Sequence, residues 1–191
     1  MFQDGERMSK EIDWEELATA LGLVIKDGEQ GSSEAAKRAL ELLIGEEALR
    51  ASVDYYIAGR RGAELARSVL WQLHPWSAMK YCYEIFNGQR SLEDRRMAVE
   101  LVRVVADHRA LSWVAEFLDD EDSHIQVWGV GVLDQLLWSH LIEPEAAEDL
   151  LRMAERHQNE AVRERVEFIR SFLSARTGSD KQEPQRHPDE T

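Results

Sequence analysis

The chain offers one candidate nucleophile, Cys82, and the histidine nearest to it in the sequence is His74. A cysteine becomes a reactive thiolate when a base or a cationic group lies beside it. The segment around Cys82 reads MKYCYEIF, and in so apolar a helix a cysteine is most often an inert, buried residue. We therefore expect Cys82 not to be catalytic and the chain not to be an enzyme.

Four consecutive acidic residues could bind a metal ion; we call this run, Asp119, Asp120, Glu121 and Asp122, the acidic turn. The run lacks the central glycine and the closing glutamate of a calcium-binding loop. The chain has no HExxH motif, and its one GxG, at Gly129–Gly131, lies in an apolar stretch without the lysine of a phosphate-binding loop. We expect no metal and no cofactor, and we expect Asp122 or Ser123 to cap the helix that follows.

Six tryptophans are present, which is a high content for a chain of this length. Trp14, Trp113 and Trp138 recur with apolar neighbours three or four residues away and are predicted to lie in the core. Trp71 and Trp128 occupy helix turns whose core positions other residues already supply, so they could face a partner. The candidate partner-binding residues are Asp119, Asp120, Glu121, Asp122, Trp71, Trp128, Tyr55 and Tyr56.

Basic residues gather on two segments of the first half, at Arg60, Arg61, Arg67, Arg95 and Arg96. Acidic residues lie one helical turn away from some of them, at Glu64, Glu93 and Glu100. We expect these arginines to be solvated or paired with those glutamates rather than to form a binding patch.

The elements that must position these residues are predicted to be helices, because only four prolines interrupt long stretches rich in Ala, Leu, Glu and Arg. Asp13, with Glu16 three residues later, predicts a capped first helix that runs to about Ile25. Glycines at 45 and 59 and the proline at 75 separate further helices. The predicted ranges are 33–44, 46–58, 61–73, 75–86, 91–106, 109–118, 123–139, 144–157 and 160–175. We expect one helical domain over residues 11–175, with a flexible N-terminus at 1–10 and a disordered tail at 176–191.

The segment VWGVGV alternates like a strand, and two glycines inside a helix each cost about 1 kcal/mol relative to alanine. We still predict a helix, because Ile125, Gly129, Val132 and Leu136 follow a period near 3.6 residues. The glycines are then expected to let neighbouring backbones approach closely.

Helix pairs recur about every 30 residues, which indicates an internal repeat. Three units share a polar or acidic loop followed by a helix with apolar residues at helical spacing. Their sequences are GQRSLEDRRMAVELVRVV, LDDEDSHIQVWGVGVLDQLL and RHQNEAVRERVEFIRSFL. The pattern resembles the HEAT or HEAT-like α-helical repeat family over roughly residues 30–175. Val162-Arg163 matches best, and Gln126 stands at the position of the arginine. The resemblance implies a short right-handed α-solenoid of about five antiparallel helix pairs that binds through its concave face, and it implies no particular chemistry.

The 191 residues include 23 Lys plus Arg and 37 Asp plus Glu, a net charge of −14, which argues against a nucleic-acid binder. No apolar run approaches the roughly 20 residues that span a bilayer, so no membrane partner is expected. The single cysteine favours a reducing, cytoplasmic setting.

We therefore predict a non-catalytic protein-binding module that offers an acidic surface to a basic partner, such as an immunity or inhibitor protein that neutralises a basic toxin enzyme. A general scaffold or assembly factor is the alternative. HEAT-like repeats also occur in bilin lyases and in DNA glycosylases. The first would need a bilin cleft, for which Cys82, Trp71 and Tyr81 are the candidate residues, and the second would need a basic groove. A homo-oligomer that uses exposed apolar helices at one end of the array also stays open.

Overall fold

The computed structural model of the chain describes residues 12–26 and 28–179. It is all-α apart from one short antiparallel strand pair, and it contains ten α-helices and one 3-10 helix in the described part. The chain divides into two compact units, Met1–Gly45 and Glu46–Thr191. This division falls inside the range 11–175 that the sequence assigns to a single domain.

The N-terminal unit contains α1 (Trp14–Ala20), β1 (Val24–Ile25), β2 (Gly28–Glu29) and α2 (Ser33–Ile44). Asp13 caps α1 as predicted, since its Oδ1 accepts a hydrogen bond from the Glu16 N–H at 2.9 Å. The prediction that this helix runs to Ile25 is wrong. The helix stops before Gly22, which has a positive φ of 71°, and the residues after it form the strand pair.

The C-terminal unit contains the other helices in sequence order. They are α3 (Glu46–Ile57), α4 (Ala63–Leu73), α5 (Trp76–Asn87), α6 (Leu92–Val105), η1 (His108–Trp113), α7 (Val114–Leu118), α8 (Ser123–Trp138), α9 (Pro144–Glu155) and α10 (Glu160–Ser179). The sequence predicts one helix over 109–118, but the structure has a 3-10 helix followed by the short α7. The last helix continues past 175, so residues 176–179 are helical and not part of a disordered tail. The rest of the predicted tail, and the predicted flexible residues 1–10, lie outside the described residues.

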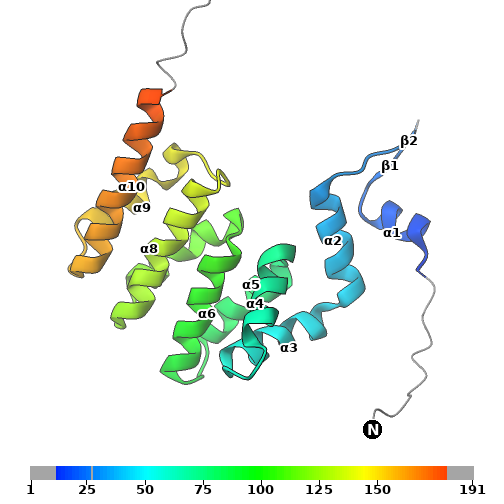
Figure 1. The fold of residues 1–191 in the computed structure, drawn as a ribbon, viewed down its shortest axis with the longest axis horizontal. Helices are drawn as coiled ribbons and strands as arrows, with labels where there is room; N and C mark the ends of the chain where they lie inside the picture. Colours follow the sequence, from blue (N-terminus) through cyan, green and yellow to red (C-terminus); the bar gives the residue numbers. More distant parts are fainter. Residues whose placement is uncertain (1–11, 27, 180–191) are drawn as a thin grey trace, which may run out of the picture. The chain divides into compact units, whose positions relative to one another are not determined.

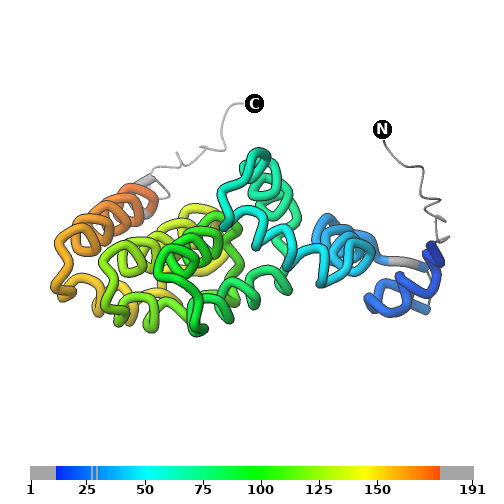
Figure 2. Tube along the Cα trace, turned by 90° about the horizontal axis from the view of Figure 1, so that it is seen from below, coloured from blue at the N-terminus to red at the C-terminus, as the bar shows by residue number. Residues whose placement is uncertain are grey.

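Helices of the C-terminal unit pack as consecutive pairs in two layers. The pairs α3/α4, α5/α6, α7/α8 and α9/α10 are each in contact, and α4, α6, α8 and α10 also contact one another in that order. Figure 1 shows these four helices side by side, and Figure 2 shows from a second direction that the chain passes through the unit in sequence order. The continuous core between the layers includes Leu49, Met79, Leu101, Phe117 and Leu133, all at most 1% exposed.

The glycines of VWGVGV explain how α8 fits between its neighbours. A Cβ atom at Gly129 would stand 2.6 Å from Phe117 Cβ and 3.4 Å from the backbone carbon of the same residue. A Cβ atom at Gly131 would stand 2.5 Å from Arg103 Cδ. The predicted close approach of a neighbouring backbone is confirmed at Gly129, whereas Gly131 makes room for a side chain.

The helices α6, α8 and α10 begin in the same way. The side chains of Ser91, Asp122 and Asn159 each accept a hydrogen bond from a backbone N–H in the first turn, at 3.1–3.2 Å. Four residues later a long polar side chain donates to a backbone carbonyl of the preceding segment. These bonds join Arg95 Nε to Phe86 O (2.8 Å), Gln126 Nε2 to Asp120 O (2.7 Å) and Arg163 Nη1 to His157 O (2.6 Å). Gln126 therefore makes the same kind of bond as the arginines at the equivalent positions.

Candidate functional site

The acidic turn lies between α7 and α8, and half of it is engaged with α6. Asp122 Oδ1 and Oδ2 accept hydrogen bonds from Arg96 Nε and Nη2 at 3.0 and 2.6 Å. Asp120 Oδ2 accepts a charge-assisted bond from Arg95 Nη2, and Asp120 Oδ1 accepts the Asp122 backbone N–H at 2.9 Å. Two of the four carboxylates are thus neutralised within the protein and fix the position of the turn.

The bonds from Arg96, followed by those from the first N–H groups of α8, lower the pKa of Asp122 to about 2. Asp122 is therefore the residue that caps α8, which settles the choice between Asp122 and Ser123. Asp119 and Glu121 differ from their neighbours, because both are exposed and neither carboxylate has a partner among the described residues. Of the four carboxylates that the sequence predicts to contact a partner, these two are the ones that are exposed and unpaired.

The two adjacent tyrosines among the candidate residues point in different directions. Tyr55 is 36% exposed, and its hydroxyl donates to the backbone oxygen of Arg61 at 2.7 Å. Tyr56 is only 6% exposed, and its hydroxyl donates to Glu100 Oε2 at 2.6 Å. The prediction that Tyr56 contacts a partner is wrong, because the side chain on that turn of α3 is the one that faces the core.

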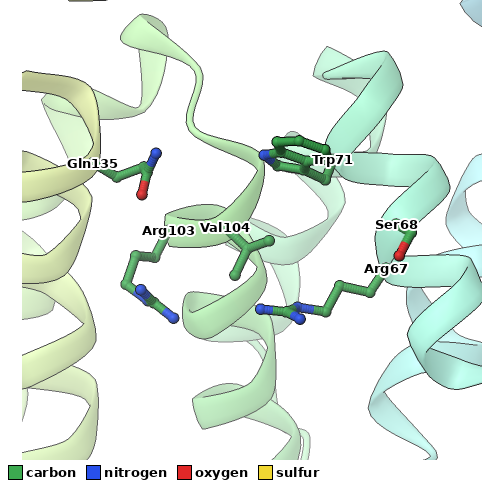
Figure 3. A pocket seen from close by; sticks show the side chains of 6 residues that line it. All are labelled: Arg67, Ser68, Trp71, Arg103, Val104 and Gln135. Atoms are coloured by element: carbon green, nitrogen blue, oxygen red, sulfur yellow. The ribbon is translucent and has the colours of Figure 1, made fainter. Parts of the chain in front are cut away.

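Trp71 and Trp128 both lie on the α4–α6–α8 layer, as predicted, but they differ in accessibility. Trp71 is 50% exposed and lines a groove of about 380 Å³ (Figure 3). Trp128 is partly buried, and the Arg103 guanidinium covers its ring at 4.8 Å from the ring centre. Of the two, Trp71 is the accessible one.

The prediction that Trp14, Trp113 and Trp138 lie in the core holds for one of them. Trp113 is partly buried, and it stacks on Trp76 and Tyr83 with ring centres 5.1 and 4.4 Å away. Trp14 is 63% exposed and Trp138 is 55% exposed. Their apolar neighbours in the sequence do not bury them, because Trp14 is the first residue of α1 and Trp138 is the last residue of α8, where its ring contacts Phe172 alone among the described aromatic rings.

The groove beside Trp71 brings together residues that lie far apart in the sequence. It is lined by Arg67, Ser68 and Trp71 of α4, Arg103 and Val104 of α6, and Gln135 of α8. We call these six residues the arginine groove. Of them, only Arg67 and Trp71 were noted in the sequence as surface residues. Arg103 and Gln135 carry no local signal, since only the packing of three helices places them together.

Most arginines of the C-terminal unit form ion pairs with carboxylates of the same chain, as expected for Arg67 and Arg96. Those within 4 Å of a carboxylate are Arg50, Arg67, Arg90, Arg95, Arg96, Arg103, Arg109, Arg152, Arg165 and Arg170. Several exposed carboxylates have no such partner in the described part of the chain. They are Glu47, Asp119, Glu121, Glu143, Glu145, Glu160, Glu164 and Glu167. The excess negative charge is therefore left on the surface.

Cys82 is fully buried in the core, as predicted for an inert cysteine. Burial, reinforced by the negative charge of Asp54, raises the pKa of its thiol. Residues 12–26 and 28–179 contain no group of three or more His, Cys, Asp or Glu side chains that could hold a metal ion. Over the same residues, no helix has both the length and the apolar composition needed to cross a bilayer.

Comparison of the chain with protein family models, with curated protein sequences and with solved structures found no match.

Proposed function

We propose that the chain is a non-catalytic protein-binding module that presents Asp119 and Glu121 to a basic surface of a partner protein. The observation that carries the proposal is the construction of the acidic turn. Arg95 and Arg96 hold two of its carboxylates inward, and the other two face solvent on a turn whose backbone is fixed. A preorganised pair of charges loses little entropy when a partner binds.

The charge distribution supports the same proposal. Because internal ion pairs occupy ten arginines, few cations are left to screen the exposed carboxylates. Such a surface speeds the encounter with a basic partner and repels nucleic acid. An immunity or inhibitor protein that neutralises a basic enzyme is the role that uses these properties most directly, and a scaffold or assembly factor is the alternative.

Our proposal includes a HEAT-like array of right-handed helix pairs, with a cytoplasmic setting as expected from the single cysteine. The repeated start of α6, α8 and α10 supports the array. The Asn159 side chain also bonds to Ser123 O and Gln126 Oε1, at 3.3 and 2.8 Å, so the turn before α10 is tied to the start of α8. The starts of α8 and α10 therefore lie side by side, and the exposed Glu160 and Glu164 add to the charge around the acidic turn.

An enzyme of the bilin-lyase or glycosylase type is less well supported. A lyase that used Cys82 would need an accessible thiol, but this thiol is buried in the core. A glycosylase needs a basic surface that binds a DNA backbone, whereas the arginines here are largely paired with carboxylates of the same chain.

Capture of the partner from a nuclease-treated native lysate tests the proposal. Three tagged forms are compared: the unmodified chain, a double variant Asp119→Lys plus Glu121→Lys, and a control Glu143→Lys plus Glu145→Lys. The control makes the same change in net charge at exposed, unpaired carboxylates at the start of α9, away from the acidic turn.

We expect the unmodified chain and the control to retain one basic protein in stoichiometric amount, and the double variant to lose it. If that protein is an enzyme, rebinding should inhibit it. Equal retention by all three forms, or capture of acidic proteins alone, would contradict the proposal.

A further inference from the structure

The arginine groove brings two guanidinium groups close together. In Figure 3 the guanidinium groups of Arg67 and Arg103 approach each other from α4 and α6, with Val104 between them. The Trp71 indole and the Gln135 amide lie on the far side of Val104. The groove is therefore lined by two cations, an aromatic ring and an amide.

A single buried carboxylate holds both guanidinium groups. Glu100 is 9% exposed, and its Oε1 lies 3.2 Å from Arg103 Nη2 and 3.6 Å from Arg67 Nη2. Its other oxygen, Oε2, accepts the Tyr56 hydroxyl at 2.6 Å. Glu100 carries one negative charge against the two positive charges of the arginines. The other carboxylates that act on them are Glu64, which is exposed, and Asp134, which itself pairs with Arg165 at 3.2 Å.

The other contacts of the two arginines are few. Arg67 Nη1 bonds at 3.2 Å to Glu64, whose side chain is 80% exposed, so water screens this pair strongly. The Nε atoms of Arg67 and Arg103 are buried and have no hydrogen-bond partner. Arg103 is also held in place by Trp128, which lies under its guanidinium, and by Gly131, which admits its side chain.

The remaining residues favour a ligand that is more than a bare anion. Trp71 offers half of its surface, and Val104 offers methyl groups next to the cations. Gln135 Nε2 donates to Ser139 Oγ at 2.9 Å, which leaves the Gln135 carbonyl oxygen to accept an N–H. An amide acceptor beside an apolar surface is suited to a peptide backbone with an apolar side chain.

We propose that the arginine groove binds a carboxylate of a peptide segment, with an adjacent apolar side chain packed on Trp71. The carboxylate belongs to an acidic side chain or to a chain end. The proposal concerns a surface other than the acidic turn, and it stands whether or not the acidic turn binds a basic protein. A polyanion fits less well, because Glu64 pairs with Arg67 and the chain carries a net charge of −14.

Nuclear magnetic resonance titration of the full ¹⁵N-labelled chain with short peptides tests the proposal. The first probe is acetyl-Leu-Asp-Phe-Gly-amide, which carries an internal acid, and the second is its neutral isostere acetyl-Leu-Asn-Phe-Gly-amide. The third is acetyl-Gly-Leu-Phe with a free C-terminal carboxylate, and adenosine monophosphate is the fourth. A Trp71→Phe variant identifies the Trp71 indole N–H signal.

We expect at least one carboxylate peptide to shift the Trp71 indole signal and to bind about tenfold more tightly than the neutral isostere. Binding of the internal acid alone assigns the groove to acidic side chains, and binding of the free end alone assigns it to a chain terminus. Equal binding of the neutral peptide, no shift with any peptide, or tighter binding of adenosine monophosphate would each overturn the proposal.

Matched variants test whether peptide binding depends on this groove or only on the net charge of the chain. Arg67→Gln should weaken binding of the carboxylate peptide about tenfold, and Trp71→Ala should weaken it while changing no charge. The control is Arg50→Gln on α3, since Arg50 has a similar exposure (36% against 34%) and also pairs with two glutamates. We expect Arg50→Gln to leave the affinity within about twofold. Equal weakening by Arg50→Gln and Arg67→Gln would contradict a specific site.

Discussion

The close packing around α8 predicts different costs for the same substitution at two glycines, Gly129 and Gly131. Alanine at either position gains about 1 kcal/mol in helix propensity. At Gly129 the new methyl group would stand 2.6 Å from Phe117 Cβ, whereas carbon atoms pack at about 3.5–4.0 Å. The two helices would therefore have to separate by about 1 Å.

The Phe117 side chain cannot move away to accommodate the new methyl group. It is fully buried, and its ring packs edge-on against Phe86 with ring centres 4.8 Å apart. Overpacking of this kind typically costs about 1–3 kcal/mol, and the upper part of this range, about 2–3 kcal/mol, applies here because backbone atoms are also involved. After the gain in propensity, we expect Gly129→Ala to lower the free energy of unfolding by about 1–2 kcal/mol.

Gly131→Ala is the matched control, two residues away on the same helix. Its methyl group would meet Arg103 Cδ at 2.5 Å, which is a side-chain atom and not backbone, so Arg103 can shift at the cost of weakening its contacts with Glu100 and Trp128. We expect its stability to stay within about 1 kcal/mol of the unmodified chain. With a urea m-value of about 2 kcal/mol/M, the midpoint of Gly129→Ala should fall by about 0.5–1 M. A midpoint for Gly129→Ala at or above that of the unmodified chain, or equal to that of Gly131→Ala, would refute the packing argument.

Three further predictions concern single side chains. Asp122→Asn keeps a cap oxygen but loses the pair with Arg96, so we expect a loss of about 1–2 kcal/mol at pH 7 in urea unfolding. Because the folded state lowers the pKa of Asp122 from its ordinary value of 3.8 to about 2, this difference should be full above pH 4 and should shrink as the pH falls toward 2; a constant difference would contradict it. The buried Cys82 thiol, whose pKa is raised, should react with a thiol reagent at pH 8 only once urea unfolds the chain, and rapid reaction of the native protein would show that the thiol is accessible. Tyr56→Phe removes the hydroxyl that donates to Glu100 Oε2 and should cost about 1–3 kcal/mol in the same unfolding assay, and an unchanged midpoint would contradict this.

Helix locations were largely predictable because local signals mark them. Asp13, Ser91 and Asp122 stand where a cap oxygen is needed, and Gly45 and Gly59 end helices with positive φ angles of 84° and 58°. The first helix was predicted too long because its apolar residues continue past Gly22. Its predicted end at Ile25 ignored the backbone conformation that this glycine adopts.

The candidate site was predictable only in part, because it depends on contacts between distant segments. Asp120 and Asp122 read as exposed charges in the sequence, since nothing local shows that Arg95 and Arg96 reach them across about 25 residues. Tyr56 was assigned to the surface for the same reason, because its partner lies 44 residues away. Trp71 is accessible as predicted, but the same reasoning fails for Trp128, which the Arg103 guanidinium covers.

The most direct test of the account is the association rate of the captured partner, measured as a function of ionic strength. The chain and its Asp119→Lys plus Glu121→Lys variant are compared, with Glu143→Lys plus Glu145→Lys as the control. We expect the variant to associate about tenfold more slowly at low salt and with a flatter salt dependence, while the control keeps a rate close to that of the unmodified chain. Equal rates and equal salt dependence for all three forms would contradict the claim that the acidic turn receives a basic partner.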